Sequence, residues 1–390
     1  MKMIFSTVYF KRMLLSYTNA CTRSAPRATQ GGCNQKGFLL ATAFGLSGWV
    51  AASSDGSSTR SEHPVARRGN PHTLFVWDFD WTVVNCNSDE YIPAQFFEDD
   101  AELSAGFRKL LRSGMDWHAC VEAMVGQAMA KGATPEKILE AARRMPYLTG
   151  VRRTLDDIHG FRGLEPGVST GQMILSDGNT LFIGAFLEEN GLFEHFSHGV
   201  ISNEGMWDKE CAGLGRTRLR VVHQSEKYSG HNCGRCSANL CKTQALWDTL
   251  VQWFREPNAK GDSDHHEIQR RPRIVYVGDG ANDACPVLNV LGEGDVMLAR
   301  AGRKRILANG REGPETDEEA IATNGASAVV CEDDTKRAVD EGVPFGILPA
   351  LRRAREGDPS LAPKCKVLEW RTGDELRHHI GKLLEDIADD

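Results

Sequence analysis

About one fifth of the way along, the chain contains Leu74-Phe75-Val76-Trp77-Asp78-Phe79-Asp80-Trp81-Thr82, an apolar run that stops at two aspartates. A short apolar run bounded by polar residues predicts a buried strand of a parallel sheet. Side chains alternate along a strand, so Asp78 and Asp80 begin on the same side where the strand opens into a loop. Open α/β sheets bind ligands at the carboxyl ends of their strands. Because adjacent carboxylates repel unless a cation lies between them, the pair indicates a cation-dependent site.

Three later segments extend this arrangement. Met173-Ile174-Leu175 leads into Ser176-Asp177-Gly178-Asn179, again an apolar run followed by a hydroxyl and small polar residues. Lys242 stands at the start of a predicted helix. Ile274-Val275-Tyr276-Val277 leads into Gly278-Asp279-Gly280-Ala281-Asn282-Asp283, where glycines permit close backbone approach and acids suit a metal ion.

The order D-x-D-x-T, Ser, Lys and G-D-G-x-N-D resembles the four-motif signature of the haloacid dehalogenase superfamily. Within it, Asp78–Asp89 resembles the opening motif of the phosphoethanolamine/phosphocholine phosphatase family and of its near relative, the pyridoxal-phosphate phosphatase branch. His231–Lys242 and Val277–Pro286 resemble that family's C-x-x-C-x-x-N-M-C-K and V-G-D-G-A-N-D-x-C-P segments. The resemblance covers about residues 74–300, with a short return near 366–385.

This resemblance implies an α/β fold, a Rossmann-type parallel sheet with a small helical cap inserted after the first strand. We expect the core at 73–90 and 166–390 and the cap at 91–165, where apolar residues recur at helical spacing and a Thr-Pro-Glu helix start occurs. Polar insertions are expected at 255–273 and 301–364.

The resemblance also implies phosphoryl transfer through an aspartyl-phosphate. Asp78 is then the nucleophile, and Asp80 protonates the leaving alkoxide before deprotonating the hydrolytic water. Ser176 holds phosphate oxygens, and Lys242 offsets the gathered negative charge. The chain has Gly178 where the family usually has Ala, a change between small residues that leaves the loop intact.

A magnesium ion is part of the implied site. Its ligands would be Asp78, the backbone carbonyl of Asp80 and Asp279, with Asp283 as a further ligand or as an anchor behind them. Hard oxygen ligands around a phosphate suit Mg²⁺ better than zinc.

A small phosphorylated metabolite is the expected partner. The resemblance assigns Asp89 and Asp177 to substrate contact, and we place Asn179 with them. Phosphoethanolamine and phosphocholine carry a cationic amine that a carboxylate attracts. Tyr91 or Trp117 could add a cation–π contact, or could be ordinary packing residues.

Two alternatives to this function stay open on sequence grounds. Pyridoxal 5′-phosphate is the alternative substrate, and it would need a flat aromatic slot instead of carboxylates. The alternative from another class is a non-catalytic, metal-binding regulatory module that keeps the scaffold. Such a module has no need of both Asp78 and Asp80.

Composition limits the choice further. The 390 residues predict about two domains, and a net charge of −7 gives no basic field that would favour nucleic acid. One basic run, comprising Arg300, Arg303, Lys304, Arg305 and Arg311, favours a solvated helix face over a nucleic-acid patch. The sequence does not predict an oligomeric state.

Residues 1–54 differ from the rest, with six basic residues and no acidic ones. Leaders of this kind are typical of import into a plastid or mitochondrion. Their uncharged part, 37–54, could instead belong to a secretory signal or tether the protein to a membrane. Residues 55–72 are a Ser-, Gly- and Arg-containing linker.

Cysteines form one further pattern. His231, Cys233, Cys236 and Cys241 could hold zinc, with Cys211 as another candidate ligand, since C-x-x-C is a common ligand pair. The alternatives are packed thiols or redox-active thiols. A thioredoxin-type motif would follow a strand and open a helix, which this segment does not.

Overall fold

The computed structural model describes residues 71–161, 163, 168–208, 217–228, 230–231, 233, 235–255, 271–301 and 346–389, all within the unit Val65–Asp390. The predicted leader 1–54 with its apolar part 37–54, and nearly all of the linker 55–72, lie outside these residues. So do most of the insertions 255–273 and 301–364, and Cys211. No helix in the described ranges combines the length and apolarity that a membrane span requires.

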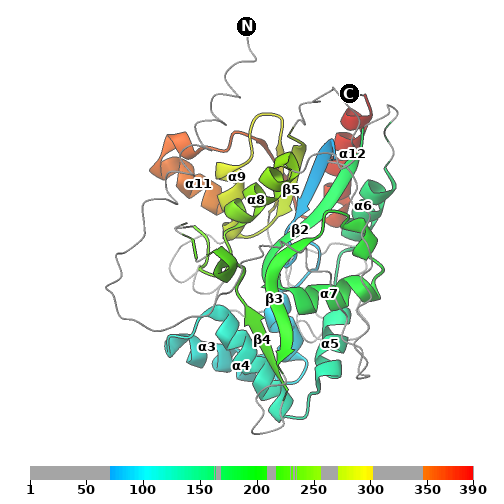
Figure 1. Cartoon of the computed structure of the whole chain (residues 1–390). Helices are drawn as coiled ribbons and strands as arrows, with labels where there is room; N and C mark the ends of the chain where they lie inside the picture. Colours follow the sequence, from blue (N-terminus) through cyan, green and yellow to red (C-terminus); the bar gives the residue numbers. More distant parts are fainter. Residues whose placement is uncertain are drawn as a thin grey trace, which may run out of the picture. The chain divides into compact units, whose positions relative to one another are not determined.

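A mostly parallel sheet organises the described residues (Figure 1). It has seven strands there, in the order β4-β3-β2-β1-β5-β6-β7, and only the β3–β4 pair is antiparallel. The strands are β1 Thr73–Trp77, β2 Thr170–Asn179, β3 Val200–Asp208, β4 Arg218–Val222, β5 Arg273–Gly278, β6 Val296–Arg300 and β7 Lys366–Trp370. The predicted α/β class is therefore confirmed, with the Asp78 strand at the centre.

Strand β2 is longer than its apolar run predicts. The run ends at Leu175, but the strand continues to Asn179 through a shift in its pairing with β3. Side chains on β3 hold this extension, because Ser202 Oγ and Asn203 Nδ2 donate to the Gly178 carbonyl at 2.8 and 3.0 Å.

Helices cover both faces of the sheet (Figure 1). Alternate side chains of β1 point to opposite faces, so Leu74 and Val76 join one apolar cluster while Phe75 and Trp77 join the other. The first cluster includes residues of α8 (Lys242–Arg255), α9 (Ala284–Asn289) and α11 (Ile347–Gly357). The second includes residues of α6 (Thr149–Gly160), α7 (Thr180–Glu189) and α12 (Gly373–Asp389).

The chain between β1 and β2 is helical, as its spacing predicts. Before α6 come α2 (Ser88–Ala94), α3 (Asp100–Arg112), α4 (Trp117–Ala130) and α5 (Pro135–Arg143). Side chains of Asn87, Asp99, Asp116 and Thr134 cap their first turns. Helix α4 packs on β4 and α5 on α7, whereas α6 packs on β2 and α12.

The end of the predicted insertion 301–364 folds against the sheet. Helix α11 buries Ile347 and Leu351, and the Ile347 amide donates to the Asp279 carbonyl at 2.9 Å. Short 3₁₀ turns complete the described elements: η1 Phe193–His195, η2 Gln224–Tyr228, η3 Ala281–Asp283 and η4 Pro359–Leu361. Helix α11 thus supports the loop that carries Asp279.

Candidate active site

The register of three strands brings the predicted motifs together. Trp77 is paired with Ile174 on β2 and with Val277 on β5, and the Asp78 amide donates to the Val277 carbonyl at 2.8 Å. The polar residues that follow these positions therefore lie at one edge of the sheet, as the sequence predicts. They are Asp78, Ser176 and Asp279.

Lys242 lies between two carboxylates. It is the first residue of α8 and is 1% exposed, with Nζ 2.8 Å from Asp78 Oδ1 and 2.7 Å from Asp283 Oδ1. Burial lowers the pKa of Lys242, but Asp283 and Asp78 outweigh burial and raise it well above its ordinary value. The lysine is therefore a fixed positive charge beside Asp78.

Both carboxylate oxygens of Asp283 accept two hydrogen bonds each. Its Oδ1 accepts from Lys242 Nζ and from the Tyr276 hydroxyl at 2.8 Å, and its Oδ2 accepts from the amides of Asp279 and Gly280 at 3.1 and 2.9 Å. A carboxylate has about four acceptor positions, so this one is saturated. This geometry favours the anchor over the ligand of the two alternatives for Asp283.

The same region fits a divalent cation. One carboxylate oxygen from each of Asp78, Asp279 and Asp283 lies within 4.8 Å of the others, and all three residues are buried. Asp78 Oδ1 accepts from the Phe79 amide at 2.8 Å and lies 2.8 Å from Lys242 Nζ. Burial and then the Asp283 charge raise the pKa of Asp78 well above its ordinary value, against the effect of Lys242. A bound cation would reverse this shift, and hard oxygen donors suit Mg²⁺.

Asp80 retains its proton more readily than an ordinary aspartate. Its Oδ1 accepts from the Ser88 amide at 2.9 Å. Desolvation, and next the charge of Asp89, raise its pKa well above the ordinary value, while the hydrogen bonds from Ser88 act in the opposite direction. A protonated carboxyl at this point can donate to a leaving oxygen.

Asp89 lies on α2 and is 3% exposed. Its Oδ2 accepts from Trp117 Nε1 at 2.8 Å, and the Trp117 ring stacks on Phe107 at 5.1 Å. Trp117 is thus a hydrogen-bond donor to Asp89, a role that the sequence does not predict. Tyr91 is buried and its hydroxyl donates to the Arg144 carbonyl, which fits the packing alternative.

Asp177 and Asn179 lie beside Asp89. Asp177 Oδ2 accepts from Asn282 Nδ2 at 2.9 Å, and the Asp177 charge raises the pKa of Asp89, as burial does more strongly. The Asn179 side chain lowers that pKa, and its Oδ1 also caps α7. The three predicted substrate residues therefore form one group.

Ser176 lies next to Asp80 across Gly178. It is buried, and its Oγ accepts from the Gly178 amide at 3.1 Å. A Cβ at position 178 would lie 3.3 Å from Ser176 Oγ and 3.8 Å from Asp80 Oδ2. All of the predicted site residues therefore occur in one region.

Sequence reasoning missed several supporting residues. Tyr276 is the only hydroxyl-bearing residue in its apolar run, and Asn282 lies inside a quoted motif, so both carried a signal. His118 carried none. His118 lies on α4, 59 residues before Asp177, and its Nε2 donates to the Asp177 carbonyl at 3.0 Å.

These features define a phosphatase-type α/β site, and comparison with known proteins agrees. Residues 73–309 match the model of the Putative Phosphatase family. The chain is 29% identical to inorganic pyrophosphatase 2 of Arabidopsis thaliana, over 59% of this chain and 71% of that protein. It is 28% identical to pyridoxal phosphate phosphatase PHOSPHO2 of Mus musculus, over 59% and 82%, and 29% identical to the Homo sapiens phosphoethanolamine/phosphocholine phosphatase, over 66% and 83%.

The chain therefore belongs to the Putative Phosphatase family. It is a phosphoric monoester hydrolase, which overturns the alternative of a non-catalytic regulatory module.

Proposed function

We propose that the protein hydrolyses phosphomonoesters through a phosphorylated Asp78, with Mg²⁺, and that its substrates have a leaving group bearing a cationic amine. The observation that carries the proposal is the placement of Asp78 against the buried Lys242, with the proton-retaining Asp80 two residues away.

In the first step a carboxylate oxygen of Asp78 bonds to phosphorus while the ester P–O bond breaks. Asp80 gives its proton to the departing alkoxide. In the second step Asp80, now a carboxylate, takes a proton from the water that attacks phosphorus. The bond between phosphorus and Asp78 then breaks, which releases phosphate and restores both side chains.

Two side chains stabilise the charge on the transferring group. The Lys242 ammonium adjoins Asp78 and so faces the negative charge that gathers there. Ser176 Oγ can donate to a phosphate oxygen while it accepts from the Gly178 amide. Both groups are buried and held by neighbours, so little reorganisation accompanies the reaction.

Asp78, the Asp80 carbonyl and Asp279 are the groups that would hold Mg²⁺. The ion supplies positive charge that offsets the phosphate oxygens. Asp283 holds the loop that carries Asp279 by accepting from the amides of Asp279 and Gly280.

The preference for a cationic leaving group comes from unneutralised charge. Among the described residues, no lysine or arginine forms an ion pair with Asp89 or Asp177. A substrate amine would supply the missing positive charge, as phosphoethanolamine and phosphocholine do. The second phosphate of pyrophosphate would instead meet carboxylates.

Phosphate release by the full chain tests this function, with Mg²⁺ or with EDTA. The substrates are phosphoethanolamine, phosphocholine, pyridoxal 5′-phosphate, pyrophosphate and p-nitrophenyl phosphate, and Asp78→Asn is the inactive control. We expect Mg²⁺-dependent turnover that is fastest on the two amine phosphates. Fastest turnover of pyridoxal phosphate or pyrophosphate would contradict the substrate assignment but not the phosphoryl-transfer mechanism. Full activity in EDTA would contradict the role of Mg²⁺.

The same proposal includes organellar import directed by residues 1–54. Fractionation of cells that express a C-terminally tagged full chain, followed by sequencing of the mature N-terminus, tests it. A shortened N-terminus in a plastid or mitochondrial fraction is expected. An intact N-terminus in the membrane fraction would favour the tether through 37–54.

A further inference from the structure

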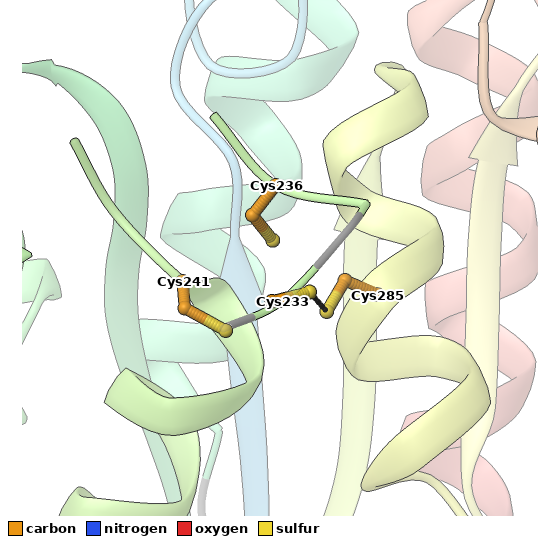
Figure 2. Close-up of side chains that lie close together, drawn as sticks. All are labelled: Cys233, Cys236, Cys241 and Cys285. Carbon is orange, nitrogen blue, oxygen red and sulfur yellow. Dashed lines mark hydrogen bonds between the residues drawn. The ribbon is translucent and has the colours of Figure 1, made fainter. Parts of the chain in front are cut away.

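Four cysteines gather beside the catalytic groups, although they come from three separate segments (Figure 2). Cys233 and Cys236 lie in a loop, Cys241 immediately precedes α8, and Cys285 belongs to α9. Their four Sγ atoms all lie within 4.8 Å of one another, and the Sγ atoms of Cys233 and Cys285 are 3.3 Å apart. The side chains point toward a common centre in Figure 2. The sequence shows only three of them as a group, because Cys285 is 44 residues beyond Cys241.

This spacing suits a single tetrahedral metal ion. A Zn–S bond of about 2.3 Å places neighbouring sulfurs of a tetrahedron about 3.8 Å apart. Thiolate sulfur is a soft ligand that favours zinc over Mg²⁺. The cluster has no carboxylate among its members, in contrast to the oxygen cluster of Asp78, Asp279 and Asp283.

The surroundings of the sulfurs also fit bound thiolates. Thr243 Oγ1 lies 2.9 Å from Cys285 Sγ, and its hydroxyl can donate to that sulfur. Asn289 Nδ2 donates to the same sulfur at 3.8 Å. Partners of this kind orient ligand side chains around structural metal ions. Cys241 and Cys285 are buried, so a charge on their sulfurs requires compensation.

His231 is not a member of the cluster, which corrects one of the candidate ligands. Its Nε2 donates to the Ser237 carbonyl at 2.8 Å, and its Nδ1 accepts from the Cys233 amide at 3.2 Å. Both ring nitrogens are therefore engaged with the backbone. The ring organises the loop that carries Cys233.

We propose that Cys233, Cys236, Cys241 and Cys285 bind one Zn²⁺ ion as a closed, structural site, separate from the magnesium site. With four protein ligands the ion has no open position for substrate, so it takes no direct part in the reaction.

The position of the four cysteines indicates which part of the protein the ion would stabilise. Cys241 adjoins Lys242 in sequence, and Cys285 follows Asp283 by two residues. Zinc would therefore clamp the beginnings of α8 and α9, which carry the two partners of the 2.7 Å Lys242–Asp283 ion pair. We expect the ion to hold Lys242 at its distance from Asp78 and to stabilise the fold.

Metal analysis of the purified full chain tests the site without reliance on the proposed function. We expect one zinc per chain, lost in Cys236→Ser and in Cys285→Ser. Cys120→Ser and Cys365→Ser are matched controls, since these buried cysteines lie outside the cluster, and both should keep the zinc. Asp279→Asn should also keep it. Loss of zinc in Asp279→Asn but not in Cys236→Ser and Cys285→Ser would overturn the proposal. A purified unaltered protein without zinc would also overturn it.

X-ray absorption at the zinc edge gives a second test on the unaltered protein, which does not depend on whether the variants fold. Four sulfur neighbours at about 2.3 Å are expected. Oxygen or nitrogen neighbours would overturn the assignment, and so would iron in place of zinc. A disulfide between Cys233 and Cys285, detected by mass spectrometry of the unreduced protein, would also overturn it.

Discussion

The two halves of the active site differ in how their negative charge is balanced. In the Lys242 half, which comprises Asp78, Lys242, Asp279 and Asp283, a buried ammonium bridges two carboxylates. In the Asp89 half, which comprises Asp80, Asp89 and Asp177, the described residues hold the carboxylates with amides and an indole N–H but provide no lysine or arginine partner.

This difference separates chemistry from recognition. Under the proposed function, the Lys242 half would need only a metal ion in addition to its own residues, and it would serve any phosphate ester. Under the proposed function, Asp89 and Asp177 would keep a negative charge that a cationic substrate group can neutralise, while Asp80 carries its proton. Substitutions in the first half should therefore affect all substrates alike, and substitutions in the second should affect discrimination among them.

The largest effect is expected from Lys242→Met. It leaves Asp78 and Asp283 buried without their shared cation, so the free energy of unfolding should fall by about 3–5 kcal/mol. Turnover of every substrate should fall at least about a hundredfold. Denaturant unfolding and phosphate release measure the two quantities.

Lys131→Met is the matched control, because Lys131 pairs with an exposed carboxylate, Glu102, at 2.5 Å. Screening by solvent makes such a pair weak, so little change is expected. Equal losses of stability and turnover in Lys242→Met and Lys131→Met would contradict the role of Lys242 as the shared cation of Asp78 and Asp283.

Asp89→Asn should change discrimination. The amide can still accept from Trp117 Nε1, but the charge that attracts the substrate amine is gone. We expect kcat/KM for phosphoethanolamine to fall about tenfold, which corresponds to about 1.4 kcal/mol. The value for p-nitrophenyl phosphate should change little. Asp116→Asn is the control. It also removes a carboxylate charge, but Asp116 is exposed and only caps α4, and asparagine is another good capping residue. Equal losses on both substrates in Asp89→Asn would refute cation recognition.

The pH profile gives a finer comparison. Asp80 must be protonated to act as an acid, so turnover of an alkyl phosphate should fall as the pH rises through the pKa of Asp80. The Asp89 charge helps to raise that pKa, second to burial. Asp89→Asn should therefore move the alkaline limb of kcat to lower pH. An unmoved limb, or a shift to higher pH, would mean that Asp80 is not the acid. The control substrate is p-nitrophenyl phosphate, whose phenolate leaves without a proton.

The smallest effect is expected from Gly178→Ala, between the two halves. The new methyl group meets Ser176 Oγ at 3.3 Å and Asp80 Oδ2 at 3.8 Å, so it needs only a slight adjustment. Activity and the pattern of substrates should stay nearly unchanged. Gly278→Ala is the contrasting variant, because its Cβ would lie 2.5 Å from Asp283 Oδ2 and must displace it, at about 1–3 kcal/mol. A larger loss of activity in Gly178→Ala than in Gly278→Ala would contradict this arrangement of the two glycines.

The fold and the grouping of Asp78, Ser176 and Asp279 could be predicted because each of these motifs follows an apolar strand. Alternation along β1 fixes where Asp78 begins, and parallel pairing with β2 and β5 then places Ser176 and Asp279 at the same edge. Lys242 could be placed because a helix begins there.

Contacts between distant segments could not be predicted. Arg300 belongs to a basic run that favours a solvated helix face, and this prediction is wrong for Arg300. It ends β6, is 4% exposed, and donates to the carbonyl of Trp81 and to Asn85 Oδ1, the latter at 2.7 Å. It thereby braces the loop after Asp78, where Trp81 has a left-handed φ of 57°. Local charge patterns contain no information about such pairings. Local cysteine spacing likewise does not predict that Cys285 joins Cys233, Cys236 and Cys241.

Direct detection of the phosphorylated residue tests whether Asp78 is the nucleophile. The full chain is mixed with phosphoethanolamine and Mg²⁺, quenched in acid within the first turnover, digested and analysed by mass spectrometry. We expect one phosphoryl group on the peptide that contains Asp78, lost on treatment with hydroxylamine and absent from Asp78→Asn. A phosphoryl group on another residue, or phosphate release by Asp78→Asn at the wild-type rate, would contradict it.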